Sequence, residues 1–89
     1  MWLDKYLKVA RILKRRTLSH ELLDLGLVNI NGKIAKPASN VKEGDILEIK
    51  LRGKLTTIRV LEVKEFAKVE ETSSMYEVIN EQVLENENI

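Results

Sequence analysis

Residues 12–23, with the sequence ILKRRTLSHELL, place three cations side by side at the point where one helix is expected to end and another to begin. Lys14, Arg15 and Arg16 repel one another unless water, an acidic side chain or an anionic partner relieves them. Thr17, the next residue, is a good N-cap for a new helix. This junction therefore indicates where the first helix ends and the second begins, and it is the candidate site for an anionic partner.

Before the junction, residues 3–15 are predicted to form an amphipathic helix. Its apolar side chains recur at helical spacing in one stripe, made of Leu3, Tyr6, Leu7, Ala10 and Leu13, with Val9 at the margin. The cations face the opposite way or lie at the helix end, and they are Lys5, Lys8, Arg11, Lys14, Arg15 and Arg16. One face and the end of this helix should therefore be basic.

After the junction, a second helix is predicted from the N-cap Thr17 to Gly26, a residue suited to the position that follows a helix. Its buried stripe would consist of Leu18, Leu22 and Leu25. First turns of helices favour acids, but none stands here before Glu21. Unpaired backbone N–H groups with Arg15 and Arg16 beside them would therefore make an anion site.

Beyond this helix the apolar spacing becomes alternating, which predicts strands. The segments that show it are LVNING at 27–32, ILEIKLR at 46–52 and LTTIRVLEVKEF at 55–66. The first runs into an Asn31-Gly32 turn, the strongest hairpin signal in the chain. The other two are expected to meet at a turn formed by Gly53 and Lys54.

The acidic end of the chain predicts a last, short helix. Its apolar residues would be Met75, Val78, Ile79 and Val83. Residues 85–89 are expected to fray. The chain should therefore consist of one domain over residues 1–66, followed by an acidic tail over residues 67–89 that contains the short helix.

Length and composition narrow the classes of function. Eighty-nine residues make one small domain, whose thin core leaves room only for a simple site. The absence of cysteine excludes disulfides and thiolate metal sites. Asp4, Lys5 and Lys8 stand where a signal peptide would need an apolar stretch, and no apolar run is long enough to span a bilayer. A cytoplasmic protein is therefore expected.

The net charge of +1 conceals a strong asymmetry along the chain. Residues 1–20 contain six Lys or Arg and one Asp, a net charge of +5. Residues 67–89 contain one Lys and six Glu, a net charge of −5. A charge distribution divided in this way favours an anionic partner at the basic end.

Catalytic and metal-binding patterns do not emerge from the sequence. His20 is the only histidine, with neither a cysteine nor a second histidine to share a metal ion. It adjoins Ser19, but neighbours in the first turn of a helix point apart and no acid is placed to orient them. Glu70 and Glu71 lie in a polar connector without the apolar pocket that a catalytic carboxylate needs. The protein is expected to be no enzyme and to bind no cofactor or metal.

The basic junction points instead to nucleic acid bound mainly through its phosphates. For a single cation such as Lys8 or Arg11, a solvated charge that complements the helix dipole is the alternative. A helix-turn-helix DNA reader is a further alternative, but the second helix offers mostly Leu and acids, which read few base edges. Structured RNA fits better. The candidate RNA-binding residues are Lys5, Lys8, Arg11, Lys14, Arg15, Arg16, Thr17, His20, Asn31, Lys33 and Lys36.

These features, in this order, resemble a known family. LDKYL, the KRRT junction, LVNING, the loop proline and VKEGD, within about residues 1–52, are similar to the S-four-type (alpha-L) RNA-binding domain. The resemblance implies an α+β fold, in which two N-terminal helices pack on a small, bent antiparallel sheet and RNA lies along the helical face. Arg16 matches an RNA-contact position of the family, and Lys5, Lys14 and Arg15 lie in matching motif positions.

The whole chain, including MYEVINEQ at residues 75–82, most resembles the stand-alone members of this family from bacterial ribosome-associated quality control. That resemblance implies a non-enzymatic factor that binds large-subunit rRNA and stabilises peptidyl-tRNA in the P site. An RqcH-like partner factor on the same subunit would drive alanine tailing. Off the ribosome, a monomer is expected.

Some residues admit more than one reading. Trp2 stands where the family usually has Arg, so the contact made by that arginine is not carried over to this chain. Trp2 either stacks on a base or ribose or covers the start of the core, and the core is the expectation. Tyr6 is expected in the core, and Asn31 first in a turn, because it tolerates positive φ. Asp4 should face the helix dipole or orient a nearby cation.

Two other functions stay open. The chain could be one of the related heat-shock S-four proteins, which handle aborted large subunits, although the sequence lacks their long, basic C-terminal extension. It could also be a protein-interaction module, in which the acidic tail helix docks a partner and the basic face is incidental.

Overall fold

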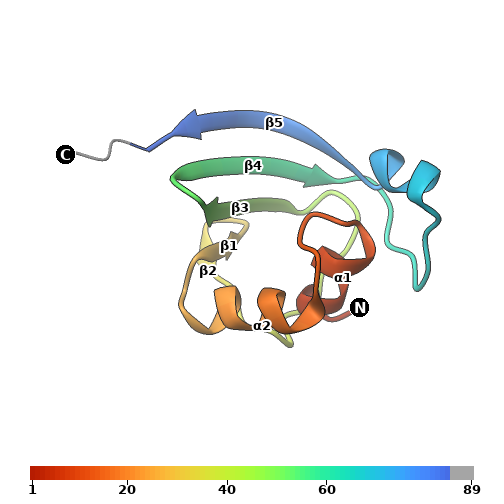
Figure 1. The fold of residues 1–89 in the computed structure, drawn as a ribbon, viewed down its shortest axis with the longest axis horizontal. Helices are drawn as coiled ribbons and strands as arrows, with labels where there is room; N and C mark the ends of the chain where they lie inside the picture. Colours follow the sequence, from red (N-terminus) through yellow and green to blue (C-terminus); the bar gives the residue numbers. More distant parts are fainter. Residues whose placement is uncertain (85–89) are drawn as a thin grey trace.

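The computed structural model describes residues 1–84 and confirms the predicted α+β fold. Two short helices, α1 (Leu3–Val9) and α2 (Arg16–Asp24), lie on one side of a curved, five-stranded antiparallel sheet (Figure 1). No helix within this part of the chain is long and apolar enough to cross a membrane. The fraying expected at residues 85–89 lies outside the described residues.

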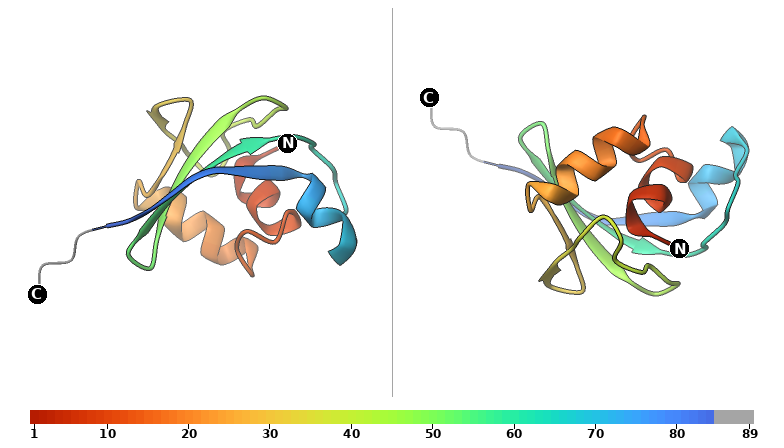
Figure 2. Two further views of the ribbon diagram at one scale, coloured as in Figure 1. Left: turned by 90° about the horizontal axis from the view of Figure 1, so that it is seen from above. Right: turned by 90° about the horizontal axis from the view of Figure 1, so that it is seen from below.

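The sheet has the strand order β2-β1-β3-β4-β5, so β2 and β5 form its edges. Its strands are β1 (Val28–Ile30), β2 (Lys33–Ile34), β3 (Ile46–Leu51), β4 (Lys54–Val60) and β5 (Tyr76–Val83). A short 3₁₀ helix, η1 (Val69–Ser74), precedes β5 and lies next to α1 in both views of Figure 2. The N-terminal helix and the segment that leads into β5 therefore meet at one end of the fold, and β5 runs from there toward the opposite end (Figure 1).

The core lies between the helices and the sheet. It contains Leu3, Tyr6, Leu7, Ala10, Leu13, Leu22, Leu23, Val28, Ala35, Val41, Leu47, Ile49, Ile58, Val60 and Met75. The apolar stripe predicted for the first helix is thus buried, with Val9 at its margin partly buried. The hydroxyl of Tyr6 donates to the carbonyl oxygen of Met75 at 2.9 Å. Burial and, to a lesser degree, the neighbouring Tyr76 raise the pKa of this hydroxyl far above its ordinary value, so it stays a protonated donor.

The first helix ends at Val9, six residues earlier than predicted. Arg11 adopts a φ of 59°. Its N–H donates to the carbonyl of Lys8 at 3.0 Å, and the N–H of Ile12 donates to that of Leu7, also at 3.0 Å. This pair of bonds is a Schellman motif, which closes a helix around a left-handed residue. The prediction was wrong because the apolar spacing continues through this turn into the core.

The second helix begins earlier than predicted and ends where expected. Arg15, with extended backbone angles, occupies the N-cap position in place of Thr17. Gly26 has a φ of 73°, and its N–H donates to the carbonyl of Leu23 at 3.1 Å, which confirms the predicted helix end. Leu25, expected to be buried, is 71% exposed, because the buried face of α2 runs through Ser19, Leu22 and Leu23 instead.

The Asn31-Gly32 hairpin turn is confirmed, with φ values of 50° and 84°. The side chain of Asn31 also joins this turn to the start of β3. Its Nδ2 donates to Oδ1 of the buried Asp45 at 3.0 Å, and its Oδ1 accepts the N–H of Ile46 at 3.0 Å. Asn31 therefore fixes the register of the first two strands against the third.

The β3–β4 hairpin is shorter than predicted. Its turn is formed by Arg52 and Gly53, one residue before the predicted pair. β4 ends at Val60 instead of continuing to residue 66. The N–H groups of Leu61, at 2.8 Å, and Glu62, at 3.1 Å, both donate to the carbonyl of Met75, and the ladder between β4 and β5 ends at this shared acceptor.

The acidic tail forms a strand where a helix was predicted. Residues Tyr76–Val83 pair with β4 along its whole length and make the edge strand β5. Met75 is fully buried before the strand, whereas Val78 and Ile79 are exposed on it. Their spacing fits a helix by coincidence, and the pairing edge offered by β4 overrides it.

Candidate nucleic-acid interface

The predicted basic corner forms where α1 turns into α2. Lys14, Arg15 and Arg16 are all exposed there, in the last residues of the turn and the first residue of α2. Within residues 1–84, no carboxylate oxygen lies within 4.0 Å of the charged nitrogens of Lys14 or Arg15. The first turn of α2 contains no acid and no capping side chain. Positive charge and uncapped N–H groups thus coincide at this corner.

Asp4 positions one of these cations. Its Oδ1 lies 3.3 Å from Nη2 of Arg16, as expected for an acid that orients a nearby cation. Asp4 is 4% exposed, and this oxygen has no well-directed hydrogen bond from the described residues, so the contact is an ion pair. A buried carboxylate needs a compensating charge. The side chain of Arg16 stays half-exposed, so Asp4 holds the guanidinium at the corner without covering it.

Arg11 occupies a position that glycine usually fills. A non-glycine residue in the left-handed region costs roughly 1–2 kcal/mol. The side chain is exposed and, among residues 1–84, has no carboxylate within 4.0 Å of its charged nitrogens. No ion pair within the described residues offsets the strain at Arg11, and its part in RNA binding stays a prediction.

Replacing Arg11 with Gly is expected to raise the free energy of unfolding by about 0.5–1 kcal/mol and to weaken RNA binding several-fold. The left-handed strain of roughly 1–2 kcal/mol disappears, offset by about 0.4–1 kcal/mol of added entropy in the unfolded chain. Urea denaturation and RNA titration measure the two effects. Arg11→Ala is the matched control, because it removes the charge and keeps the strain. Equal stabilisation by both variants would contradict this explanation.

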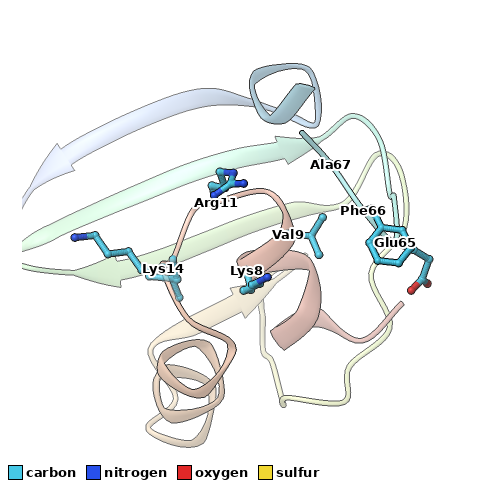
Figure 3. Close-up of a pocket in the computed structure, with 8 residues that line it drawn as sticks. Lys8, Val9, Arg11, Lys14, Glu65, Phe66 and Ala67 are labelled. Carbon is cyan, nitrogen blue, oxygen red and sulfur yellow. The ribbon is translucent and has the colours of Figure 1, made fainter. Parts of the chain in front are cut away.

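Two hollows together collect six of the eleven predicted RNA-binding residues. Lys8, Arg11 and Lys14 border a hollow of about 420 Å³ together with Val9, Leu13, Glu65, Phe66 and Ala67 (Figure 3). A second hollow of about 270 Å³ lies at the start of α2, lined by Asp4, Arg16, Thr17 and His20. Phe66, 86% exposed, was missed from the sequence because it stood at the end of a predicted strand.

Two predicted residues are engaged with acids of the same chain. Nζ of Lys5 pairs with Oε1 of Glu65. The hydrogen bond from Lys5, followed by its charge, lowers the pKa of the Glu65 carboxyl below its ordinary value. Nδ1 of His20 lies 3.1 Å from Oδ2 of Asp24, one turn further along α2. Their part in RNA binding stays a prediction.

The remaining predicted residues lie outside both hollows. Asn31 is exposed, but its side-chain amide already serves the turn and β3. Lys33 on β2 and Lys36 after it are exposed. Neither lysine has a carboxylate partner in the part of the chain that the structure describes. They would extend an RNA surface beyond the helices.

The core placement predicted for Trp2 is wrong, since its side chain is 56% exposed. Trp2 precedes α1 in an extended conformation and forms an isolated antiparallel bridge with Asn40. Neighbouring side chains in an extended chain point to opposite sides. Leu3 therefore enters the core and Trp2 faces outward.

Comparisons with known proteins agree with this architecture. Residues 1–47 match the family model of the S4 domain. The chain is 48% identical over 84 residues to the RQC P-site tRNA stabilizing factor of Bacillus subtilis (strain 168), which covers 94% of this chain and 98% of the relative. It is 47% identical over 81 residues to the protein of the same name from Streptococcus pneumoniae (strain ATCC BAA-255 / R6), covering 91% and 92%.

A solved structure shows the same fold. The trimeric structure of Vibrio cholerae heat shock protein 15 superposes with a TM-score of 0.82 at 28% sequence identity, covering 88% of this chain and 80% of the other. The resemblance found in the sequence is thereby confirmed. The chain belongs to the S4-domain family and, within it, to the RQC P-site tRNA stabilizing factors (RqcP).

Proposed function

We propose that this protein is a non-enzymatic RNA-binding factor of the bacterial cytoplasm that binds large-subunit rRNA and peptidyl-tRNA and stabilises P-site tRNA during ribosome-associated quality control. The observation that carries the proposal is the basic corner, where Lys14, Arg15 and Arg16 meet the uncapped start of α2. The names of the curated relatives support the P-site role.

The protein would act by phosphate neutralisation and fit to RNA shape. The corner offers guanidinium groups and backbone N–H groups, which grip phosphate oxygens regardless of sequence. A bound factor of this kind stabilises tRNA by adding contacts that must break before the tRNA leaves. An RqcH-like factor on the same subunit would drive alanine tailing, and the protein would be a monomer off the ribosome.

Arg16→Ala is expected to weaken RNA binding by about 10- to 150-fold, across RNA sequences generally, because a charge-assisted hydrogen bond contributes about 1.5–3 kcal/mol. The slope of log affinity against log salt should also flatten by about 1. Fluorescence anisotropy with labelled RNA measures both. The control is Glu81→Ala on β5, an exposed acid remote from the corner, which should bind as the wild type does. Unchanged binding by Arg16→Ala would remove the corner from the interface.

The test in the cell is sedimentation of a lysate that contains the tagged protein. The proposal expects the protein in the large-subunit fraction, together with peptidyl-tRNA. Recovery on intact translating ribosomes, or in neither fraction, would require a different function. Identifying the tRNA that sediments with the protein completes the experiment.

The heat-shock S-four function is the second candidate. Besides the fold match, the heat shock protein 15 homolog of Aeromonas salmonicida is 35% identical over 63 residues, covering 71% of this chain and 48% of that relative. Accumulation on large subunits only after heat shock, and without an RqcH-like factor, would favour it. The interaction-module hypothesis required a tail helix, and β5 occupies that segment instead.

A further inference from the structure

The larger hollow is lined by cations on one side and by an aromatic side chain, which is not part of the basic corner, on the other. Lys8, Arg11 and Lys14 stand on one side of it, on α1 and the turn, and Phe66 stands on the other, in the connector between β4 and η1 (Figure 3). A single exposed apolar side chain is common on protein surfaces. This one, 86% exposed, borders a hollow of about 420 Å³, within the range of roughly 300–1,000 Å³ of small-ligand sites.

The charge of the hollow is positive and uncompensated. Lys8, Arg11 and Lys14 have no carboxylate within 4.0 Å of their charged nitrogens among residues 1–84. Glu65 is the one acid of the lining, and it is paired with Lys5. The ligand that matches this lining has a negative charge for one wall and a flat apolar face for the other.

The aromatic wall is held against the helix. Glu65, which adjoins Phe66, pairs with Lys5 on α1 and so joins the connector to this helix. Just before it, Nζ of Lys64 lies 3.9 Å from Oε2 of Glu71 on η1. Phe66 is thus exposed on a segment that ion pairs fasten on its N-terminal side.

We propose that this hollow binds one unpaired nucleotide of RNA, whose base stacks on Phe66 while its phosphate lies among Lys8, Arg11 and Lys14. The inference rests on the proposed function, because Lys14 also belongs to the corner and a nucleotide held here would be part of the same RNA. The lining contains no amide or hydroxyl side chain to read a base edge. Stacking on an aromatic ring tolerates any base, so the site would select an unstacked nucleotide rather than a sequence.

The test uses the full-length chain and a single-stranded RNA of about ten nucleotides, a length within the roughly 4–16 nucleotides of single-strand sites. A central 2-aminopurine reports stacking by loss of its fluorescence. The wild type should quench it. Phe66→Leu keeps apolar bulk without the ring, and should lose the quenching and bind about 5- to 150-fold more weakly. Phe66→Trp should retain both.

Matched variants separate the contacts. Val69→Ala, which changes an exposed apolar residue of η1 outside the hollow, should behave as the wild type. Lys8→Ala should flatten the salt slope by about 1 and leave the quenching in place, because it removes a phosphate contact only. Circular dichroism confirms folding of each variant, and the exposed position of Phe66 predicts little change there.

The outcomes distinguish this inference from the function on which it rests. Wild-type protein that binds neither this RNA nor ribosomes would overturn the proposed function and the site together. If Arg16→Ala weakens binding but Phe66→Leu binds and quenches like the wild type, the function stands and the nucleotide site is rejected. If Phe66→Leu loses binding of polyglutamate but keeps that of RNA, the hollow docks an acidic protein segment instead, which also rejects the site.

Discussion

Raising the monovalent salt concentration from about 50 to about 200 mM is expected to weaken RNA binding by roughly 60- to 1,000-fold. Each neutralised phosphate releases counterions, and four to six such contacts give a slope of log affinity against log salt of about −3 to −5. The structure has enough exposed cations to make four to six phosphate contacts. Those exposed at the first helix and the corner are Lys8, Arg11, Lys14, Arg15 and Arg16.

Anisotropy titrations at four or five salt concentrations measure this slope. Lys54→Ala is the matched control for charge, because Lys54 lies on β4, away from the corner, and its Nζ is already 4.0 Å from Oε1 of Glu81. Its slope should equal that of the wild type. A flat salt dependence in the wild type would rule out binding through phosphates, and with it the role given to the corner.

Tyr6→Ala is expected to lower the free energy of unfolding by about 3–5 kcal/mol, the usual cost of truncating a buried aromatic side chain. An 89-residue domain has only roughly 5–13 kcal/mol in total. The thermal midpoint should fall by about 12 °C or more. Tyr6 is fully buried and joins α1 to the segment before β5 through Met75, so its loss opens the fold where α1 meets that segment.

Tyr6→Phe is the control, since it keeps the ring and removes one hydrogen bond. Its cost should be about 0.5–1.5 kcal/mol. The carbonyl of Met75 is not left unpaired, because it still accepts the N–H groups of Leu61 at 2.8 Å and Glu62 at 3.1 Å. Urea denaturation measures both variants. A cost below about 1 kcal/mol for Tyr6→Ala would contradict the packing described here.

Local signals predicted the parts of the fold that depend on neighbouring residues. The apolar stripe of α1, the end of α2 at Gly26 and the hairpin at Asn31-Gly32 each follow from spacing or from tolerance of positive φ within a few residues. The basic corner belongs with them, because Lys14, Arg15 and Arg16 are adjacent in the chain.

Features that depend on contacts between distant residues could not be predicted from local sequence patterns. β5 is a strand because β4 offers it a pairing edge, and nothing within its own residues reports that edge. The end of α1 was hidden because Leu13 remains in the core after the helix has closed. The position of Phe66 beside a hollow depends on the fold, because Glu65 joins the connector to α1 through Lys5, far away in the sequence.

The Schellman turn after α1 has a consequence for recognition. Its backbone bonds, from Arg11 to Lys8 and from Ile12 to Leu7, are made in the free protein and shape the loop that leads to the corner. Ordering a flexible loop on association would cost about 1–2 kcal/mol per residue of backbone entropy. Here that cost is met at folding, so an RNA bound at this loop, as proposed above, would meet a backbone that is already ordered and would require little induced fit.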